Sequence, residues 1–139
     1  MKGVSFLEVI LVIALIAILA TATAPFAANS LRQQQFISTV GILKSYLLKA
    51  QSYAMSNKGS GPWGVCQTSS TIRLYSSSCS SPAFSEDFSI PQSVNVTGLS
   101  DVSFNSPRGE PSQTLSLTVS GDNRSINLTL SPVGTLEDN

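Results

Sequence analysis

The chain has 139 residues, enough for one small domain. Eight basic side chains balance eight acidic ones, and charged residues make up only 12% of the chain, about half the share that is usual in soluble domains. Histidine is absent, which removes the commonest general base and a common metal ligand. No nucleophile–base pair, carboxylate pair or phosphate-binding glycine loop can be assembled from the remaining residues. We therefore expect no enzyme, no catalytic residue, no cofactor and no metal site.

An apolar segment follows Met1-Lys2-Gly3 directly. Residues 4–24 read VSFLEVILVIALIAILATATA and carry a single charge, Glu8. As a helix this segment would be about 31 Å long, close to the ~30 Å hydrocarbon thickness of a bilayer. Because Lys2 precedes the segment and neutral residues follow it, the positive-inside rule predicts a cytoplasmic N-terminus and an exported remainder.

A secretory signal peptide is the competing interpretation of this segment. Ala20-Thr21-Ala22 and Ala22-Thr23-Ala24 both fit the small-residue pattern of a signal cleavage site. Glu8 argues against removal, because an acid so near the start of an apolar segment opposes membrane insertion and usually has a function. We favour a retained anchor, and a secreted, small β-rich binding domain stays as the alternative.

The string Gly3-Val4-Ser5-Phe6-Leu7-Glu8 resembles the class III signal of type IV pilins and pseudopilins. The resemblance implies that a prepilin peptidase cleaves between Gly3 and Val4 and that Val4 is then N-methylated. Glu8 lies where the family keeps the glutamate that acts in filament assembly, and Pro25 lies where many members have a helix-bending proline. The departures are Val4, where Phe or Met is commoner, and a leader of only three residues.

A physical role for Glu8 stands beside the resemblance. A carboxylate among apolar helices is stable only when it is paired, and its own helix offers no cation within reach except the N-terminus. In a staggered bundle the α-amino group of a neighbouring subunit's Val4 could lie beside Glu8 and set the register between subunits. The alternative is an unpaired acid at the membrane–water boundary.

Beyond Pro25 the apolar residues become one-sided. Six of them recur at intervals of three or four residues and form what we call the seam: Phe36, Val40, Leu43, Leu47, Ala50 and Ala54. Three more apolar residues are expected to widen the seam: Ile37, Leu48 and Met55. We predict a helix from about residue 5 to 57, bent near Pro25 and ended by the glycines and proline of 57–62. The seam is expected to cover the protein's own sheet rather than a partner helix.

From Trp63 onward the apolar period changes to two, which predicts strands. The clearest pair is 114–119 and 125–130, joined by Ser120–Arg124, in which apolar residues alternate with polar, mostly hydroxyl-bearing ones. Shorter strands are predicted at 63–67, 71–75, 94–97, 102–104 and, after the Pro132-Val133-Gly134 turn, around Leu136. The order of these segments is similar to the minor pseudopilins of the GspH/FimT class.

The predicted fold class is α+β and pilin-like: one long N-terminal helix, with an apolar transmembrane half and an amphipathic half, packed on antiparallel β-sheet. The expected organisation is a prepilin leader at 1–3, a transmembrane and polymerisation helix at 4–28, and an extracytoplasmic globular domain at 29–139. The resemblance implies a single-pass protein of the bacterial inner membrane that passes into a pilus or pseudopilus filament.

Cys66 and Cys79 are the two cysteines, and the inferred topology places both outside the cytoplasm. Thiols there are commonly oxidised, so we predict a disulfide, with two free thiols as the alternative. The bridge would close a loop of about 13 residues and contribute on the order of 3 kcal/mol in the chain-entropy model. Two cysteines without histidine do not make a zinc site of the usual kind.

The expected function is that of a structural minor pilin or pseudopilin, assembled from the inner membrane into a type II secretion pseudopilus or a type IV pilus. Its expected partners are other pilin subunits in a helix bundle, the prepilin peptidase and the inner-membrane assembly platform. The alternative is an adhesin or a DNA-uptake receptor. Residues 58–139 carry four basic and seven acidic side chains, and although Arg108 and Arg124 in predicted turns could meet, no nucleic-acid binding is expected.

Overall fold

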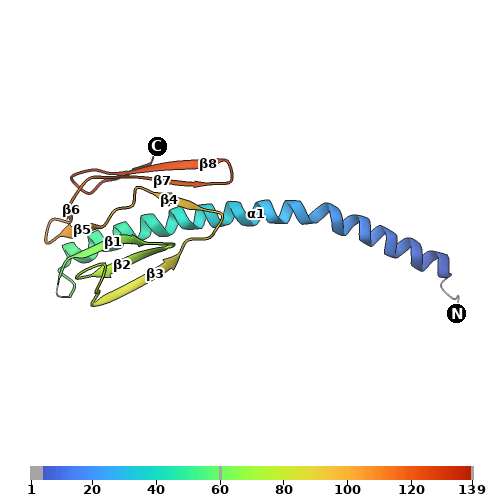
Figure 1. Ribbon diagram of the computed structural model, residues 1–139, viewed down its shortest axis with the longest axis horizontal. Coiled ribbons are helices and arrows are strands. Elements are labelled where there is room, and N and C mark those ends of the chain that lie inside the picture. The colour runs from blue at the N-terminus through green and yellow to red at the C-terminus, as the bar shows by residue number, and fades with distance from the viewer. Residues whose placement is uncertain (1–4, 60, 139) are drawn as a thin grey trace.

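The computed structural model describes residues 5–59 and 61–138, without the side chains of 21–27. A helix, α1 (Phe6–Met55), is followed by a globular part built from strands (Figure 1). In chain order the described strands are β1 (Trp63–Thr68), β2 (Thr71–Ser76), β3 (Phe84–Ser89), β4 (Asn95–Thr97), β5 (Val102–Asn105), β6 (Glu110–Pro111), β7 (Leu115–Gly121), β8 (Arg124–Leu130) and β9 (Leu136–Asp138).

The strands form two antiparallel sheets. The first has the order β3-β2-β1-β5-β6 and the second the order β4-β7-β8-β9. The C-terminal half of α1 packs against β1, β2 and β5 of the first sheet and against β7 of the second. Figure 1 shows this half of α1 running alongside the strands, while its N-terminal half projects away from them.

The seam packs in the hydrophobic core, as predicted. All six of its residues are buried, and they share one core with apolar residues of both sheets. Tyr46 and Thr39 are buried as well, and the Thr39 hydroxyl donates to the carbonyl of Gln35. The predicted widening of the seam is wrong, because Ile37, Leu48 and Met55 are each more than half exposed. Ile37 and Leu48 are not among the residues of α1 that pack in the shared core, and Met55 only touches Gly109 in the turn between β5 and β6.

The predicted C-terminal hairpin is confirmed. Strands β7 and β8 pair from Leu115↔Leu130 to Gly121↔Arg124. The two residues between them, Asp122 and Asn123, have φ of 44° and 63°, the left-handed conformation that a tight two-residue hairpin turn requires. Five apolar side chains of the hairpin are buried: Leu115, Leu117, Val119, Leu128 and Leu130.

The predicted fold class is wrong as stated. The side chains of α1 are described in two stretches, 6–20 and 28–55, and among the described residues we find no helix that is both long and apolar enough to span a bilayer. A long apolar helix is therefore not part of the described fold. The strands also divide into two sheets around the seam, because the hairpin of β7 and β8 and the group around β1 each bury their apolar side against it.

Two strands were missed by the sequence pattern. Strand β3 reads FSEDFS, in which two adjacent acids interrupt the alternation of apolar and polar residues, yet it pairs with β2 along its whole length. The acids are accommodated because Lys49 pairs with Glu86 and Arg73 with Asp87, both at the surface. Strand β6 has only two residues, Glu110 and Pro111, which is too short for any periodicity to indicate.

Candidate functional site

The N-terminal stretch of α1 is an uncovered apolar surface. Its large apolar side chains range from 44% exposed at Val9 to 81% exposed at Phe6, and we call them the apolar arm: Phe6, Leu7, Val9, Ile10, Leu11, Val12, Ile13, Leu15, Ile16, Ile18 and Leu19. Burying one such side chain is worth about 1.5–3 kcal/mol. A contiguous apolar surface of this size marks an interaction site, so lipid or protein is expected to cover it.

Glu8 lies inside the apolar arm, in the first turn of α1. A carboxylate at this end of a helix is favoured by the helix dipole and by the unpaired amide groups of the first turn. The side chain is exposed, and no ion pair to it is found among the described residues. Because the Glu8 side chain is exposed, a group on another molecule can reach its carboxylate.

The predicted processing residues Gly3 and Val4 lie outside the described residues, and so does the side chain of Pro25, where a kink is predicted. Cleavage between Gly3 and Val4, methylation of Val4 and the kink at Pro25 therefore stay predictions.

The predicted disulfide between Cys66 and Cys79 is confirmed. The two Cα atoms are 6.3 Å apart, and the bridge joins the buried middle of β1 to the segment that follows β2. Arg73 supports the same segment, because its Nη1 donates to the carbonyl of Cys79 at 3.2 Å. Its Nε donates to Asp87 Oδ1 at 2.8 Å, which ties β2 to the edge strand β3. This bridge is structural and holds a serine-rich loop in place.

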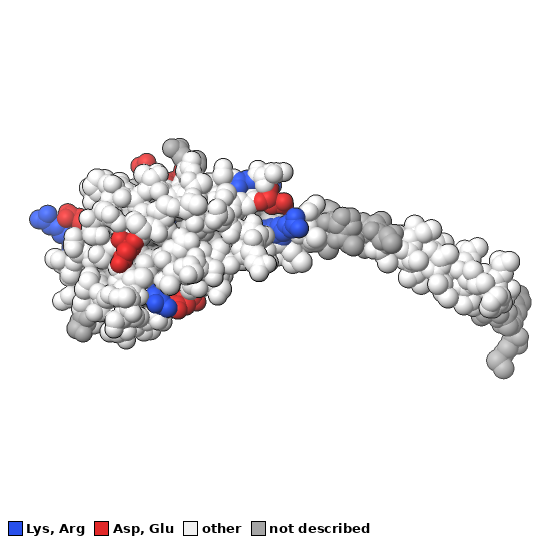
Figure 2. Space-filling view, in the orientation of Figure 1, with Lys and Arg blue, Asp and Glu red and all other residues white. Residues whose placement is uncertain are grey.

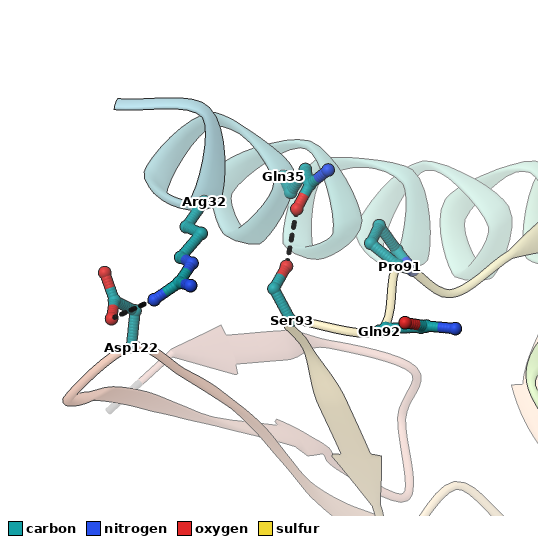
Figure 3. Close-up of a pocket in the computed structure, with 6 residues that line it drawn as sticks. All are labelled: Arg32, Gln35, Pro91, Gln92, Ser93 and Asp122. Carbon is teal, nitrogen blue, oxygen red and sulfur yellow. Dashed lines mark hydrogen bonds and ion pairs between the residues drawn. The ribbon is translucent and has the colours of Figure 1, made fainter. Parts of the chain in front are cut away.

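A groove of about 610 Å³ lies at the neck, where α1 meets the globular part (Figure 3). The Ser93 hydroxyl donates to Gln35 Oε1, and the Arg32 guanidinium lies 3.9 Å from Asp122 Oδ1. The segment before β4 and the turn between β7 and β8 are thereby held against α1. Two polar contacts thus connect α1 to the globular part across this groove.

Two buried phenols have shifted acidities. Burial, and next the nearby Glu86 carboxylate, raise the pKa of Tyr46 to about 12. Burial, and next the hydrogen bond that its hydroxyl donates to Asp101, raise the pKa of Tyr75 still further. Both phenols therefore stay protonated at neutral pH, and each anchors a neighbouring element rather than transferring protons. Within the described ranges, no three side chains of the metal-binding types gather.

Arg108 and Arg124 do not meet. Gly109, next to Arg108, lies against Met55 at the C-terminal end of α1, whereas Gly121, which pairs with Arg124, lies near Phe36. Phe36 and Met55 are roughly 28 Å apart along the helix at 1.5 Å per residue. Arg108 also pairs with Glu110 at 3.6 Å. In the view of Figure 2, basic side chains mostly lie beside acidic ones, so this face carries no basic patch.

Gln51 is an organising residue that the sequence pattern did not indicate. Its Nε2 donates to the carbonyls of Gly109 and Gly134, at 3.2 and 3.3 Å, and so joins α1 to two loops that are far apart in the sequence. Its position among other polar residues on α1 gave no signal of this role. Comparison of the chain with protein-family models, curated proteins and solved structures finds no match.

Proposed function

We propose that this chain is a structural subunit of a membrane-derived filament, a minor pilin or pseudopilin of a type II secretion pseudopilus or a type IV pilus. The single observation that carries the proposal is the apolar arm, which projects from a globular part whose own core is closed (Figure 1). A bundle of such arms would bury their apolar surface, as a filament core requires. The prepilin-like string Gly3–Glu8 supports the same proposal.

The proposed localisation is the bacterial inner membrane, with a cytoplasmic N-terminus and an extracytoplasmic globular part, followed by transfer into the filament. The Cys66–Cys79 disulfide supports this placement, because disulfides persist in oxidising compartments. The proposed partners are other pilin-like subunits, a prepilin peptidase and an inner-membrane assembly platform. Glu8 is proposed to pair with the α-amino group of Val4 in a neighbouring subunit and so to set the register of the bundle.

The processing step is tested by mass spectrometry of the mature N-terminus. We expect a chain that begins at methylated Val4, and a Gly3→Glu variant should stay uncleaved. A chain that begins at Thr23 or Pro25 would contradict the proposal and favour a secreted β-rich binding domain.

The assembly step is tested with Glu8→Ala. This variant should fold and be cleaved like the unchanged protein but should lose incorporation into filaments, measured by cross-linking of assembled subunits. Glu137→Ala removes an exposed acid from β9 and is the matched control. Equal incorporation of Glu8→Ala and the control would overturn the charge-pair proposal.

A role as a DNA receptor is less well supported. Arg108 and Arg124 lie at opposite ends of the globular part, and five of the described basic side chains pair with carboxylates. Phosphate contacts supply most non-specific affinity for DNA, and they require clustered, available cations. No observation of the described residues favours an adhesin over a filament subunit.

A further inference from the structure

A second pocket lies at the opposite end of α1 from the apolar arm. It has a volume of about 320 Å³, and its walls are the rings of Tyr53, Trp63 and Phe84, with Lys58 at its rim. The ring centroids of Tyr53 and Trp63 are 4.7 Å apart, and those of Trp63 and Phe84 are 5.7 Å apart. We call it the distal aromatic pocket. Its apolar walls suit an aromatic or large aliphatic group.

The pocket is held in shape by the chain around it. The Trp63 indole donates to the carbonyl of Lys58, and the Lys58 amide donates to the carbonyl of Tyr53 at 3.0 Å. Trp63 is only 5% exposed and is fixed in the core, whereas Phe84 is 50% exposed. Phe84 thus presents an apolar face to solvent beside a rigid wall, which is the arrangement expected of a preformed binding pocket.

Lys58 gives the pocket a preference for negative charge. Arg32, Lys44, Lys49, Arg73 and Arg108 each pair with a carboxylate, whereas Lys58 and Arg124 form no ion pair with any described residue. The Lys58 ammonium lies 3.9 Å from the centroid of the Tyr53 ring. An ammonium group that this contact holds over an aromatic ring can still form an ion pair with a carboxylate of a ligand.

Strand β3 offers an open edge beside the pocket. It is the outermost strand of its sheet and starts at Phe84. The Ile90 amide donates to the Ser70 carbonyl, which continues the register of β3 with β2. The backbone groups of Phe84, Glu86 and Phe88 therefore face β2, and those of Ser85, Asp87 and Ser89 face outward. An extended segment can pair with the outward groups.

We propose that the distal aromatic pocket and the edge of β3 bind an extended peptide segment of a partner protein. The segment pairs with β3, places an aromatic or large apolar side chain in the pocket, and brings an adjacent carboxylate to Lys58 Nζ. Main-chain hydrogen bonds then provide affinity, and the pocket together with Lys58 provides specificity. This inference does not depend on the filament proposal, because the pocket residues belong to the C-terminal end of α1 and the starts of β1 and β3, and these elements lie far from the N-terminal half of α1 (Figure 1).

Trp63 is the one tryptophan of the chain, so its fluorescence reports on the pocket directly. The full chain in mild detergent is titrated with a blocked heptapeptide of serine and threonine that holds one phenylalanine next to one glutamate. A twin peptide carries glutamine in place of the glutamate. We expect saturable binding of both peptides, about two- to fivefold weaker for the twin, as one exposed ion pair allows. Lys58→Gln should abolish this difference, and the matched control Arg124→Gln should preserve it.

A second pair of variants tests the apolar wall. Phe84→Ser should weaken binding about tenfold or more, while Val133→Ser, which also alters an exposed apolar residue, should leave it unchanged. Far-UV circular dichroism verifies that each variant is folded. A peptide that is N-methylated at alternate backbone positions should lose binding. The proposal would be overturned if binding does not saturate, if the two peptides bind with equal affinity, or if the N-methylated peptide binds as well as the unmodified one.

Discussion

Because of Tyr46 and Tyr75, the free energy of unfolding depends on pH in the alkaline range. A free phenol has a pKa of about 10, whereas burial raises the pKa of Tyr46 to about 12 and that of Tyr75 further. The unfolded chain therefore loses these protons near pH 10 while the folded chain keeps them. Because the folded state then binds more protons, the free energy of unfolding falls as pH rises from 10 toward 12.

We expect the urea midpoint of the unchanged protein to be clearly lower at pH 11 than at pH 9. The double variant Tyr46→Phe/Tyr75→Phe should show a much smaller decrease. At neutral pH, Tyr75→Phe alone should cost about 1–2 kcal/mol, because the hydrogen bond to the Asp101 carboxylate is lost. An equal alkaline decrease in the unchanged protein and the double variant would contradict this assignment.

Gly134 is required by both its conformation and its surroundings. Its φ is 82°, and an added Cβ would lie 2.3 Å from Gln51 Nε2 and 3.0 Å from the Gly109 carbonyl oxygen. Gly59 has a similar φ of 79° but no atom within 4 Å of such a Cβ, which makes it the matched control. We expect Gly59→Ala to lower the free energy of unfolding by about 1–2 kcal/mol. Gly134→Ala should lower it by at least about 1 kcal/mol more, because Gln51 must give up its hydrogen bonds to the carbonyls of Gly109 and Gly134. Denaturant unfolding measures both, and equal losses would show that Gln51 adjusts freely.

At the level of the helix, the two sides of α1 can be compared with one residue type. Leu43 is fully buried in the seam, while Leu48 is 55% exposed. We expect Leu43→Ala to destabilise the protein by about 3–5 kcal/mol through lost burial and the cavity left behind. Leu48→Ala should change the free energy of unfolding by less than about 0.5 kcal/mol. Similar losses at both positions, measured by urea unfolding, would mean that the outer side of α1 is covered in solution.

The same helix shows what the sequence could and could not predict. The seam was predictable because its 3–4 spacing selects one face, and the hairpin of β7 and β8 because its alternation selects one side of a strand. The exposure of Ile37, Leu48 and Met55 was not, since apolar character alone does not say which neighbours reach a helix face. Strand β3 was missed because its sheet partner, and not its own pattern, makes it a strand.

Contacts between distant segments were the least predictable part of the candidate site. The pairing of Cys66 with Cys79 followed from there being only two cysteines in the chain. The division into two sheets, the separation of Arg108 from Arg124 and the gathering of Tyr53, Trp63 and Phe84 all depend on topology. The processing site at Gly3 and Val4 stays a prediction from the local motif alone.

The whole molecule joins a closed globular part to an uncovered apolar arm (Figures 1 and 2). Every buried apolar residue of the described chain lies between Phe36 and Leu130. Removing residues 1–28 therefore deletes none of the core residues that the structure describes. The new helix start would read Asn29-Ser30-Leu31-Arg32-Gln33, in which Ser30 and Gln33 have the spacing of a capping box.

We therefore predict that the fragment 29–139 folds on its own and is monomeric. Its free energy of unfolding should match that of the full chain in detergent to within about 1 kcal/mol, because the residues that pack the core are all retained. Sedimentation should show a monomer for the fragment and, once detergent is removed, association of the full chain through the apolar arm. An Arg32→Ala version of the fragment, which loses the ion pair to Asp122 at the neck, should change stability by less than about 1 kcal/mol, since both side chains are well exposed. If the fragment unfolds or self-associates, the apolar arm and the globular part depend on each other for stability, and the arm is not a free assembly surface.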